Sequence, residues 1–253
     1  MKIYEIYFSP TGGTKNTADI LTNELGNDII TYDITKENKE VNNLVLTKDD
    51  IAVIAVPSFG GRVPSTAIKR ISEIKGNGAF AVLLCVYGNR AYEDTLAELY
   101  DTVKANNFNV IAAVSAVAEH SIVRQIAANR PDEIDKKQLT EFAKKIYHKF
   151  STGKTNEFFI PGGRPYKKYS NMPIVPKLTK ACTKCGLCSK ECPVQAIDKN
   201  NPKKVDSKIC ISCMRCISVC PNNARKINSI MLFVSKITLS KVCSKRKECE
   251  LFI

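Results

Sequence analysis

The chain has 253 residues, of which 38 are lysine or arginine and 25 are acidic, for a formal net charge of +13 at pH 7. This length allows one domain with a sizeable core and a second, small domain. No apolar run approaches the roughly 18 residues that a membrane-spanning helix needs, so we expect no membrane span. Eleven cysteines and an opening without a secretory signal favour a reducing compartment, and we expect a cytoplasmic protein.

The first 25 residues predict a strand, a loop and a helix. Residues 2–8 read as a buried strand, a loop of small and hydroxyl-bearing residues follows at 9–14, and a helical pattern runs to Leu25. In such a loop the backbone N–H groups and the helix dipole face one point, which favours a phosphate ligand. The spacing is neither that of a Walker A loop nor G-x-G-x-x-G. A serine or threonine helix cap beside a glycine turn is the alternative.

The segment F-S-P-T-G-G-T-K-N-T-A at residues 8–18 resembles the flavin-phosphate loop of the flavodoxin family. The resemblance implies a bound FMN whose phosphate is held by hydroxyl groups and backbone amides, without a cationic side chain. The residues that would bind the phosphate are then Ser9, Thr11, Gly12, Gly13 and Thr14.

Four further apolar segments predict strands, at residues 28–34, 50–56, 79–86 and 108–117. Helical patterns run to about Lys75, to about Ala105 and over residues 131–150. Strands that are apolar on both faces and alternate with helices predict an α/β fold with a doubly wound parallel sheet. In the flavodoxin-like order 2-1-3-4-5, ligands lie beyond the carboxyl ends of the strands, near the first and third.

Two glycine-containing loops follow the third and fourth predicted strands, P-S-F-G-G-R-V-P at 57–64 and Y-G-N-R-A-Y-E-D at 87–94. Together with the phosphate loop they should meet at one edge of the sheet and hold the flavin ring from two sides. An aromatic residue could stack on the ring, although packing in the core is the alternative for each. A cation at this edge would favour the anionic reduced ring. The candidate cofactor residues here are Pro57, Ser58, Phe59, Gly60, Gly61, Arg62, Tyr87, Gly88, Asn89, Arg90 and Tyr92.

The spacing C-x2-C-x2-C-x3-C-P occurs twice, in a first run that begins at Cys182 and a second that begins at Cys210. This is the bacterial-type signature for two 4Fe–4S clusters, in which the fourth cysteine of each run binds the other cluster. Paired zinc sites and a disulfide framework are the alternatives, but zinc sites usually show paired C-x2-C knuckles. The predicted ligands of one cluster are Cys182, Cys185, Cys188 and Cys220, and those of the other are Cys210, Cys213, Cys216 and Cys192.

The positive charge is concentrated in the same part of the chain. Residues 1–150 hold 18 basic and 19 acidic residues, whereas residues 151–253 hold 20 and 6. This excess can offset the negative charge of the clusters, and it can dock a redox protein with an acidic face. We expect no nucleic-acid partner, because no helix-turn-helix, RNA-recognition or basic-aromatic pattern is present.

These observations divide the chain into four parts. We expect a flavodoxin-like FMN-binding domain at 1–152, a linker at 153–179, a small α+β ferredoxin-like domain at 180–225 and a basic tail at 226–253. The P-G-G-R-P segment at 161–165 excludes a helix or central strand from the linker. Cys243 and Cys249 match no cluster spacing, and we expect free thiols there.

In this order the domains resemble the EFR1 family of flavodoxin–ferredoxin fusion proteins, over about residues 1–225. The resemblance implies electron transfer. FMN takes one or two electrons and each cluster carries one, so the chain would couple one-electron and two-electron carriers. The alternative is an FMN-dependent iron–sulfur oxidoreductase that reduces an organic substrate. Only His120, Tyr87 and Tyr92 offer a general acid near the flavin loops, which favours the carrier, and we expect a structural role for His120.

Overall fold

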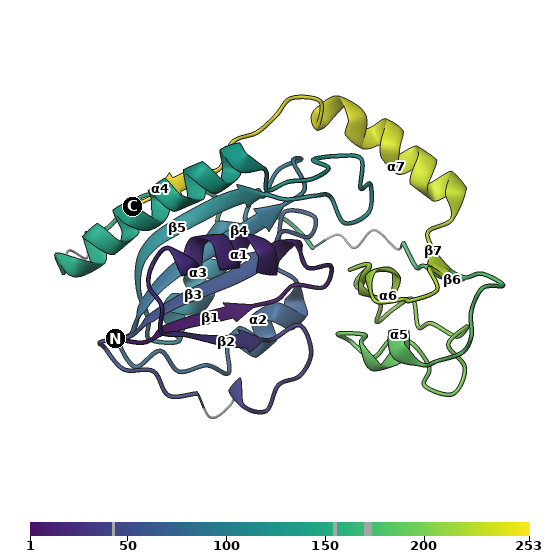
Figure 1. Cartoon of the computed structure of the whole chain (residues 1–253), viewed down its shortest axis with the longest axis horizontal. Coiled ribbons are helices and arrows are strands. Elements are labelled where there is room, and N and C mark those ends of the chain that lie inside the picture. Colours follow the sequence, from purple (N-terminus) through teal and green to yellow (C-terminus); the bar gives the residue numbers. More distant parts are fainter. Residues whose placement is uncertain (42–43, 154–155, 170–173) are drawn as a thin grey trace.

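The computed structural model describes residues 1–41, 44–153, 156–169 and 174–253 (Figure 1). A six-stranded sheet with the order β2-β1-β3-β4-β5-β8 forms its centre. The first five strands are parallel, so the predicted order 2-1-3-4-5 is confirmed. The strands of this sheet are β1 (Ile3–Tyr7), β2 (Ile29–Asp33), β3 (Ile51–Pro57), β4 (Phe80–Tyr87), β5 (Asn109–Val117) and β8 (Glu250–Phe252).

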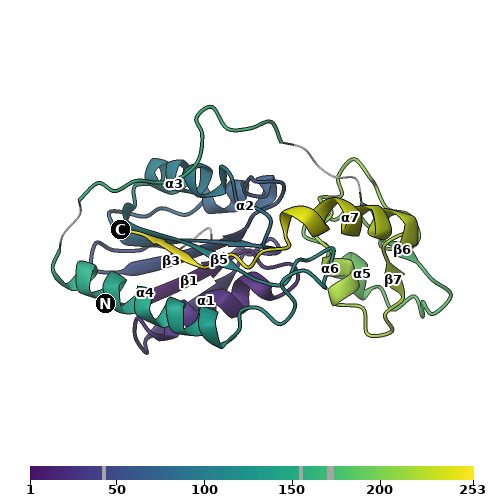
Figure 2. The same cartoon turned by 90° about the horizontal axis from the view of Figure 1, so that it is seen from above.

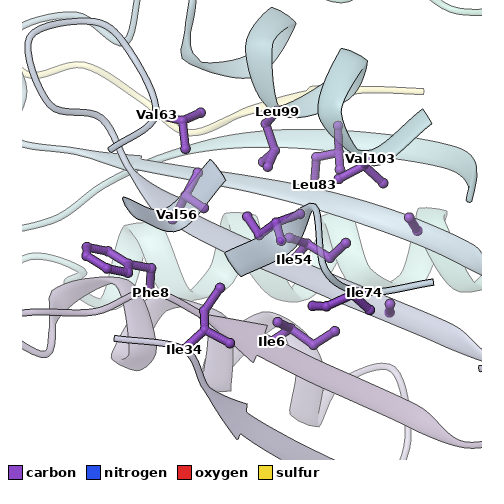
Figure 3. Close-up of a cluster of buried hydrophobic side chains, with 14 of the residues drawn as sticks. Ile6, Phe8, Ile34, Ile54, Val56, Val63, Ile74, Leu83, Leu99 and Val103 are labelled. Carbon is purple, nitrogen blue, oxygen red and sulfur yellow. The ribbon is translucent and has the colours of Figure 1, made fainter. Parts of the chain in front are cut away.

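Two pairs of helices cover the two faces of the sheet (Figure 2). On one face, α2 (Ser65–Ile71) and α3 (Thr95–Ala105) pack over a cluster that includes Ile54 and Leu83, shown in Figure 3. On the other face, α1 (Gly13–Asn23) and α4 (Glu133–Ser151) pack over a cluster that includes Val53 and Leu84. Alternate residues of each central strand therefore enter different cores, which is why these strands are apolar throughout.

A smaller module contains the cysteine runs, and its first strand lies inside the segment 153–179 that was expected to be a linker. It is built from the short helices α5 (Leu187–Lys190) and α6 (Arg215–Ser218) and an antiparallel pair of two-residue strands, β6 (Lys177–Leu178) and β7 (Arg225–Lys226). Figure 1 shows this module beside the end of the sheet at which β1 and β3 terminate. The chain thus has the flavodoxin-like and ferredoxin-like parts that the sequence predicts.

Residues 226–253, expected as a basic tail, form defined structure that the sequence did not reveal. They continue into α7 (Ser229–Val242) and then into β8, which pairs antiparallel with β5 and places Leu251 beside Val114. A buried ion pair between Arg130 and Asp135 fixes this segment, because Arg130 Nη1 donates to the Lys247 carbonyl oxygen at 2.8 Å. No helix within the described ranges is long and apolar enough to cross a membrane.

Glu5 is a buried acid in the central strand β1, with a side chain that faces α1 and is only 2% exposed. Its Oε1 has no hydrogen-bond partner among the described residues. Burial, assisted by the negative charge of Asp19, raises the pKa of Glu5 to about 7. The folded protein therefore favours the neutral form of this carboxyl group.

Replacing Glu5 by glutamine should stabilise the protein, and more so at high pH. The folded-state pKa lies above the ordinary value, so the stability that the protonated carboxyl provides is complete below pH 4.5 and is lost as the pH rises through 7. We expect the gain in the free energy of unfolding for Glu5→Gln to be about 1 kcal/mol larger at pH 8.5 than at pH 6. Urea unfolding at both pH values measures it, with the exposed Glu24→Gln as control. An equal change at both pH values would contradict the assignment.

Candidate functional site

Two cavities in the small module are each lined by four cysteines. The first cavity brings three cysteines of the first run together with Cys220 of the second, and the second cavity brings three of the second run together with Cys192. The runs therefore exchange their fourth cysteines in space, as the spacing predicts. The lining cysteines are Cys182, Cys185, Cys188 and Cys220 in the first cavity, and Cys192, Cys210, Cys213 and Cys216 in the second.

A backbone repeat with an offset of 28 residues builds the two cavities. Gly186 and Met214 occupy equivalent places, and both adopt left-handed backbone angles, with φ of 76° and 63°, directly before α5 and α6. This sharp turn folds the chain around a cavity, and it is strained at Met214 because a side chain is present. Backbone N–H groups also point at sulfur, since Ala224 N lies 3.2 Å from Cys220 Sγ. Such contacts favour thiolates.

The cavities suit an iron–sulfur group better than a single metal ion. Within the described parts of the chain, no three histidine, cysteine, aspartate or glutamate side chains converge on one point. The thiols are thus too widely spread for one zinc ion, whose sulfur ligands lie at ~2.3 Å, whereas a cluster takes one thiolate at each iron. Burial raises the pKa of the Cys213 and Cys216 thiols to about 12. Positive iron would supply the charge that their ionisation requires.

The loop between β1 and α1 presents unpaired N–H groups. Gly12, with a φ of +92°, directly precedes α1 and makes no side-chain cap to it. Ser9 Oγ accepts a hydrogen bond from Lys15 N at 2.9 Å, while Ser9 N donates to Thr35 Oγ1 at 2.7 Å. Within the described residues the backbone N–H groups of 11–14 have no acceptor. Ser9 thus caps one N–H of the first helical turn, as the alternative expects, while the unpaired N–H groups of 11–14 fit a phosphate.

The loops after β3 and β4 are joined at the same edge of the sheet. Asp94 N donates to the Gly61 carbonyl oxygen at 3.0 Å, and the hydroxyls of Ser58 and Thr95 lie 2.7 Å apart. Gly61 has a φ of +83°, and a Cβ atom there would lie 2.8 Å from Glu93 Cβ. Only glycine therefore fits at this position. Pro57 ends β3, Phe59 and Gly60 belong to the first of these loops, and Gly88 belongs to the second, where it abuts His120.

Several polar residues of these loops are engaged by other parts of the chain. Arg62 pairs with Glu98 at 2.6 Å and lies over the ring of Tyr166, so its charge is used within the protein and is not a free cation at the flavin edge. The Asn89 amide donates to the carbonyl oxygens of Cys243 and Lys245, which belong to the segment before β8. These roles were not predicted, because each depends on a partner distant in the chain, such as Glu98 of α3 for Arg62 or Lys245 for Asn89.

The aromatic and basic side chains after β4 have local partners as well. Tyr87 and Tyr92 form an edge-to-face pair with ring centroids 5.3 Å apart, and the Tyr92 hydroxyl donates to Glu250 at 2.8 Å. Arg90 pairs with Glu93 at 2.9 Å. Packing of both tyrosines within the protein, the alternative to flavin stacking, thus has direct contacts in its favour.

His120 follows β5 and has a structural role, as expected. Its Nδ1 accepts hydrogen bonds from the N–H groups of Ile122 and Val123, at 3.2 and 3.1 Å. Burial, together with the positive charge of Arg90, lowers the pKa of His120 to about 4. The ring is therefore neutral at pH 7 and holds the turn after β5 in place.

The second cavity adjoins the phosphate loop. Arg215 lies between two cysteines of this cavity, and its Nη1 donates to the Pro10 carbonyl oxygen at 3.3 Å while its Nη2 pairs with Glu191 at 2.5 Å. Arg70 of α2 donates to the Pro193 carbonyl oxygen at 2.8 Å. Cys213 itself belongs to the apolar cluster on the α2 and α3 face of the sheet. These contacts fix the small module against the carboxyl edge of the sheet.

Comparisons with known proteins agree with this description. Residues 181–224 match the model of the 4Fe-4S dicluster domain. No curated protein matches the chain significantly. Among solved structures, a flavodoxin of Streptococcus pneumonia TIGR4 is 19% identical, and the alignment covers 59% of this chain and 99% of that one with a TM-score of 0.43.

Two further flavodoxins are similar to a comparable share of the chain. One, from the domain Archaea, is 12% identical over 60% of this chain and 99% of its own, with a TM-score of 0.44. The other, from Megasphaera elsdenii, is 20% identical over 56% and 98%, with a TM-score of 0.37. By its own strand order the first part of the chain is flavodoxin-like, and the second is a dicluster domain, a combination that points to redox function.

Proposed function

We propose that this chain is a cytoplasmic electron-transfer protein, as in the EFR1 family, that passes electrons between two 4Fe–4S clusters and one FMN. The observation that carries the proposal is the position of a four-cysteine cavity beside a loop whose backbone N–H groups at 11–14 are unpaired among the described residues. When bound, FMN would accept one or two electrons, and the clusters would move one each. Residues 9–14 would hold the phosphate, and the two four-cysteine sets would hold the clusters.

The contacts between the two parts of the chain suggest an order for the carriers. The second cavity is tied to the sheet domain through Arg215, Arg70 and the apolar packing of Cys213, whereas no hydrogen bond or ion pair joins the described walls of the first cavity to that domain. The cluster of the second cavity would therefore exchange electrons with the flavin. The cluster of the first cavity would face an external partner.

The surface beside the first cavity suits an acidic partner. A hollow next to Cys182 is lined by Lys180, Lys184 and Lys203, all exposed, and no acidic side chain lines it within the described residues. A redox protein with an acidic docking face would be steered to this hollow. Electron exchange with such a partner should therefore slow as the ionic strength rises.

The groups that an oxidoreductase would need as general acids are engaged within the protein. His120 is neutral and accepts two backbone hydrogen bonds, and the Tyr92 hydroxyl is bound to Glu250. Burial raises the pKa of Tyr87 far above its ordinary value. These observations favour the carrier over the enzyme.

Cofactor analysis of the full chain, purified without oxygen, tests the proposal. We expect about eight iron atoms and one FMN per chain, with cluster EPR signals and loss of flavin absorbance in a single reductive titration. Riboflavin, which lacks the phosphate, serves as the control and should bind more weakly than FMN. Zinc in place of iron, or equal affinities for FMN and riboflavin, would count against the proposal.

A further inference from the structure

Arg225 is a fully buried cation in the wall between the two cysteine cavities. It lines both cavities, and its side chain is 2% exposed. Its Nη1 donates to the Pro176 carbonyl oxygen at 3.0 Å, and its Nη2 donates to the carbonyl oxygen of Pro202. Its Nε has no hydrogen-bond partner among the described residues, and none of the described carboxylates forms an ion pair with it.

The 28-residue repeat shows that packing does not require an arginine here. The equivalent position in the first run is Ile197, which is also buried and also forms a β-bridge, to Val205, as Arg225 pairs with Leu178. An apolar residue thus fills this place in one half of the module. In the other half a charged residue does so, and its charge needs a separate explanation.

Electrostatics supplies that explanation. A buried charge without an opposite charge costs several kcal/mol, and carbonyl oxygens compensate only part of that cost. The groups that the two cavities would hold are anionic, since thiolates carry the clusters. Arg225 lines both cavities together with their cysteines, so its positive charge favours negative charge in each of them.

We propose that Arg225 is a shared counter-charge that raises the reduction potentials of both 4Fe–4S clusters. The inference rests on the proposed function, because it requires the clusters to be bound. Each electron that a cluster accepts adds negative charge within reach of the guanidinium, whose positive charge stabilises it. The unpartnered Nε–H is also a free hydrogen-bond donor, and donors to cluster sulfur act in the same direction.

Potentiometric titration of the holoprotein, followed by EPR, tests this role. Arg225→Ile introduces the residue type found at the equivalent position, Ile197. It should shift the reduction potentials of both clusters to more negative values. Arg225→Lys should keep most of the wild-type potential because it keeps the charge. Lys203→Ile is the matched control, since it removes an exposed cation beside the first cavity and should change the potentials little because water screens it. Unchanged potentials in an Arg225→Ile protein with full iron content would overturn the proposal.

Iron content separates the remaining outcomes. If Arg225→Ile loses iron and Arg225→Lys retains it, the positive charge is needed to hold the clusters, which supports a counter-charge. If both variants lose iron equally, the role is one of packing and hydrogen bonding, and the proposal fails. Wild-type protein without iron would instead reject the proposed function, so the two failures are distinguishable.

Discussion

A Cys220→Ala protein should lose the cluster in the first cavity, although Cys220 is part of the second cysteine run. The reason is geometric, because Cys220 lines the cavity of Cys182, Cys185 and Cys188. We expect the loss of about four of the roughly eight iron atoms per chain, and an EPR spectrum of one isolated cluster after reduction. Cys192→Ala is the matched control and should remove the other cluster.

Double variants identify which cluster is lost. Adding Cys182→Ala to Cys220→Ala should cost no further iron, because both cysteines line one cavity. Adding Cys213→Ala should remove nearly all the iron, because Cys213 lines the other cavity. The reverse pattern would show that each run binds its own cluster.

Replacing Asp135 by alanine should destabilise the protein by about 3–5 kcal/mol, the cost of leaving a buried charge without its partner. The Asp135 side chain is fully buried, and it accepts hydrogen bonds from Arg130 Nε at 2.7 Å and from Arg246 Nη2 at 3.0 Å. Arg130, whose side chain is 6% exposed, would remain as an uncompensated cation. Urea unfolding followed by circular dichroism measures the change.

Two comparisons make this result specific. Glu133→Ala removes an exposed acid of the same helix turn, whose pair with Lys136 should contribute no more than about 1 kcal/mol. Arg130→Met combined with Asp135→Ala should recover part of the loss, because it removes the unpaired cation. A loss for Asp135→Ala as small as that for Glu133→Ala would refute a structural role for the buried pair.

The parallel sheet could be predicted from sequence because its signals are local. The strand β3 is a continuous run of seven buried residues, and the elements on either side have helical spacing. The strand β8 could not be predicted, because three residues have no measurable period and its existence depends on pairing with β5. For the same reason the Arg130–Asp135–Arg246 cluster, which joins distant parts of the chain, left no trace in the sequence.

The candidate site divides in a similar way. Cysteine spacing predicts both ligand sets, since a short loop fixes which corners of a cluster it can reach. The roles of Asn89 and Arg62 depend on residues that are distant in the sequence. Arg62 donates to the Lys167 carbonyl oxygen at 2.5 Å, and Asn89 donates to that of Cys243. Arg225 did leave a signal, because the 28-residue repeat pairs it with Ile197.

The pairing of β8 with β5 makes the cluster module an insertion into the sheet domain. The chain leaves that domain after Lys167, which still bonds to Asp94, and returns to it through α7 and β8 (Figure 1). A module held at two points samples fewer orientations than one on a single tether, so its effective concentration at the phosphate loop is high.

The pairing of β8 with β5 also determines where the protein can be truncated without exposing the edge of the sheet. A fragment that ends at residue 152 lacks β8 and would present the edge of β5 around Val114 as an open template for other strands. A short loop that joins Lys167 to the segment before β8 would keep this edge covered and would keep the linker bonded to Asp94. Exchange of one electron-carrying module for another should therefore succeed between these two junctions, and fail when everything after α4 is removed.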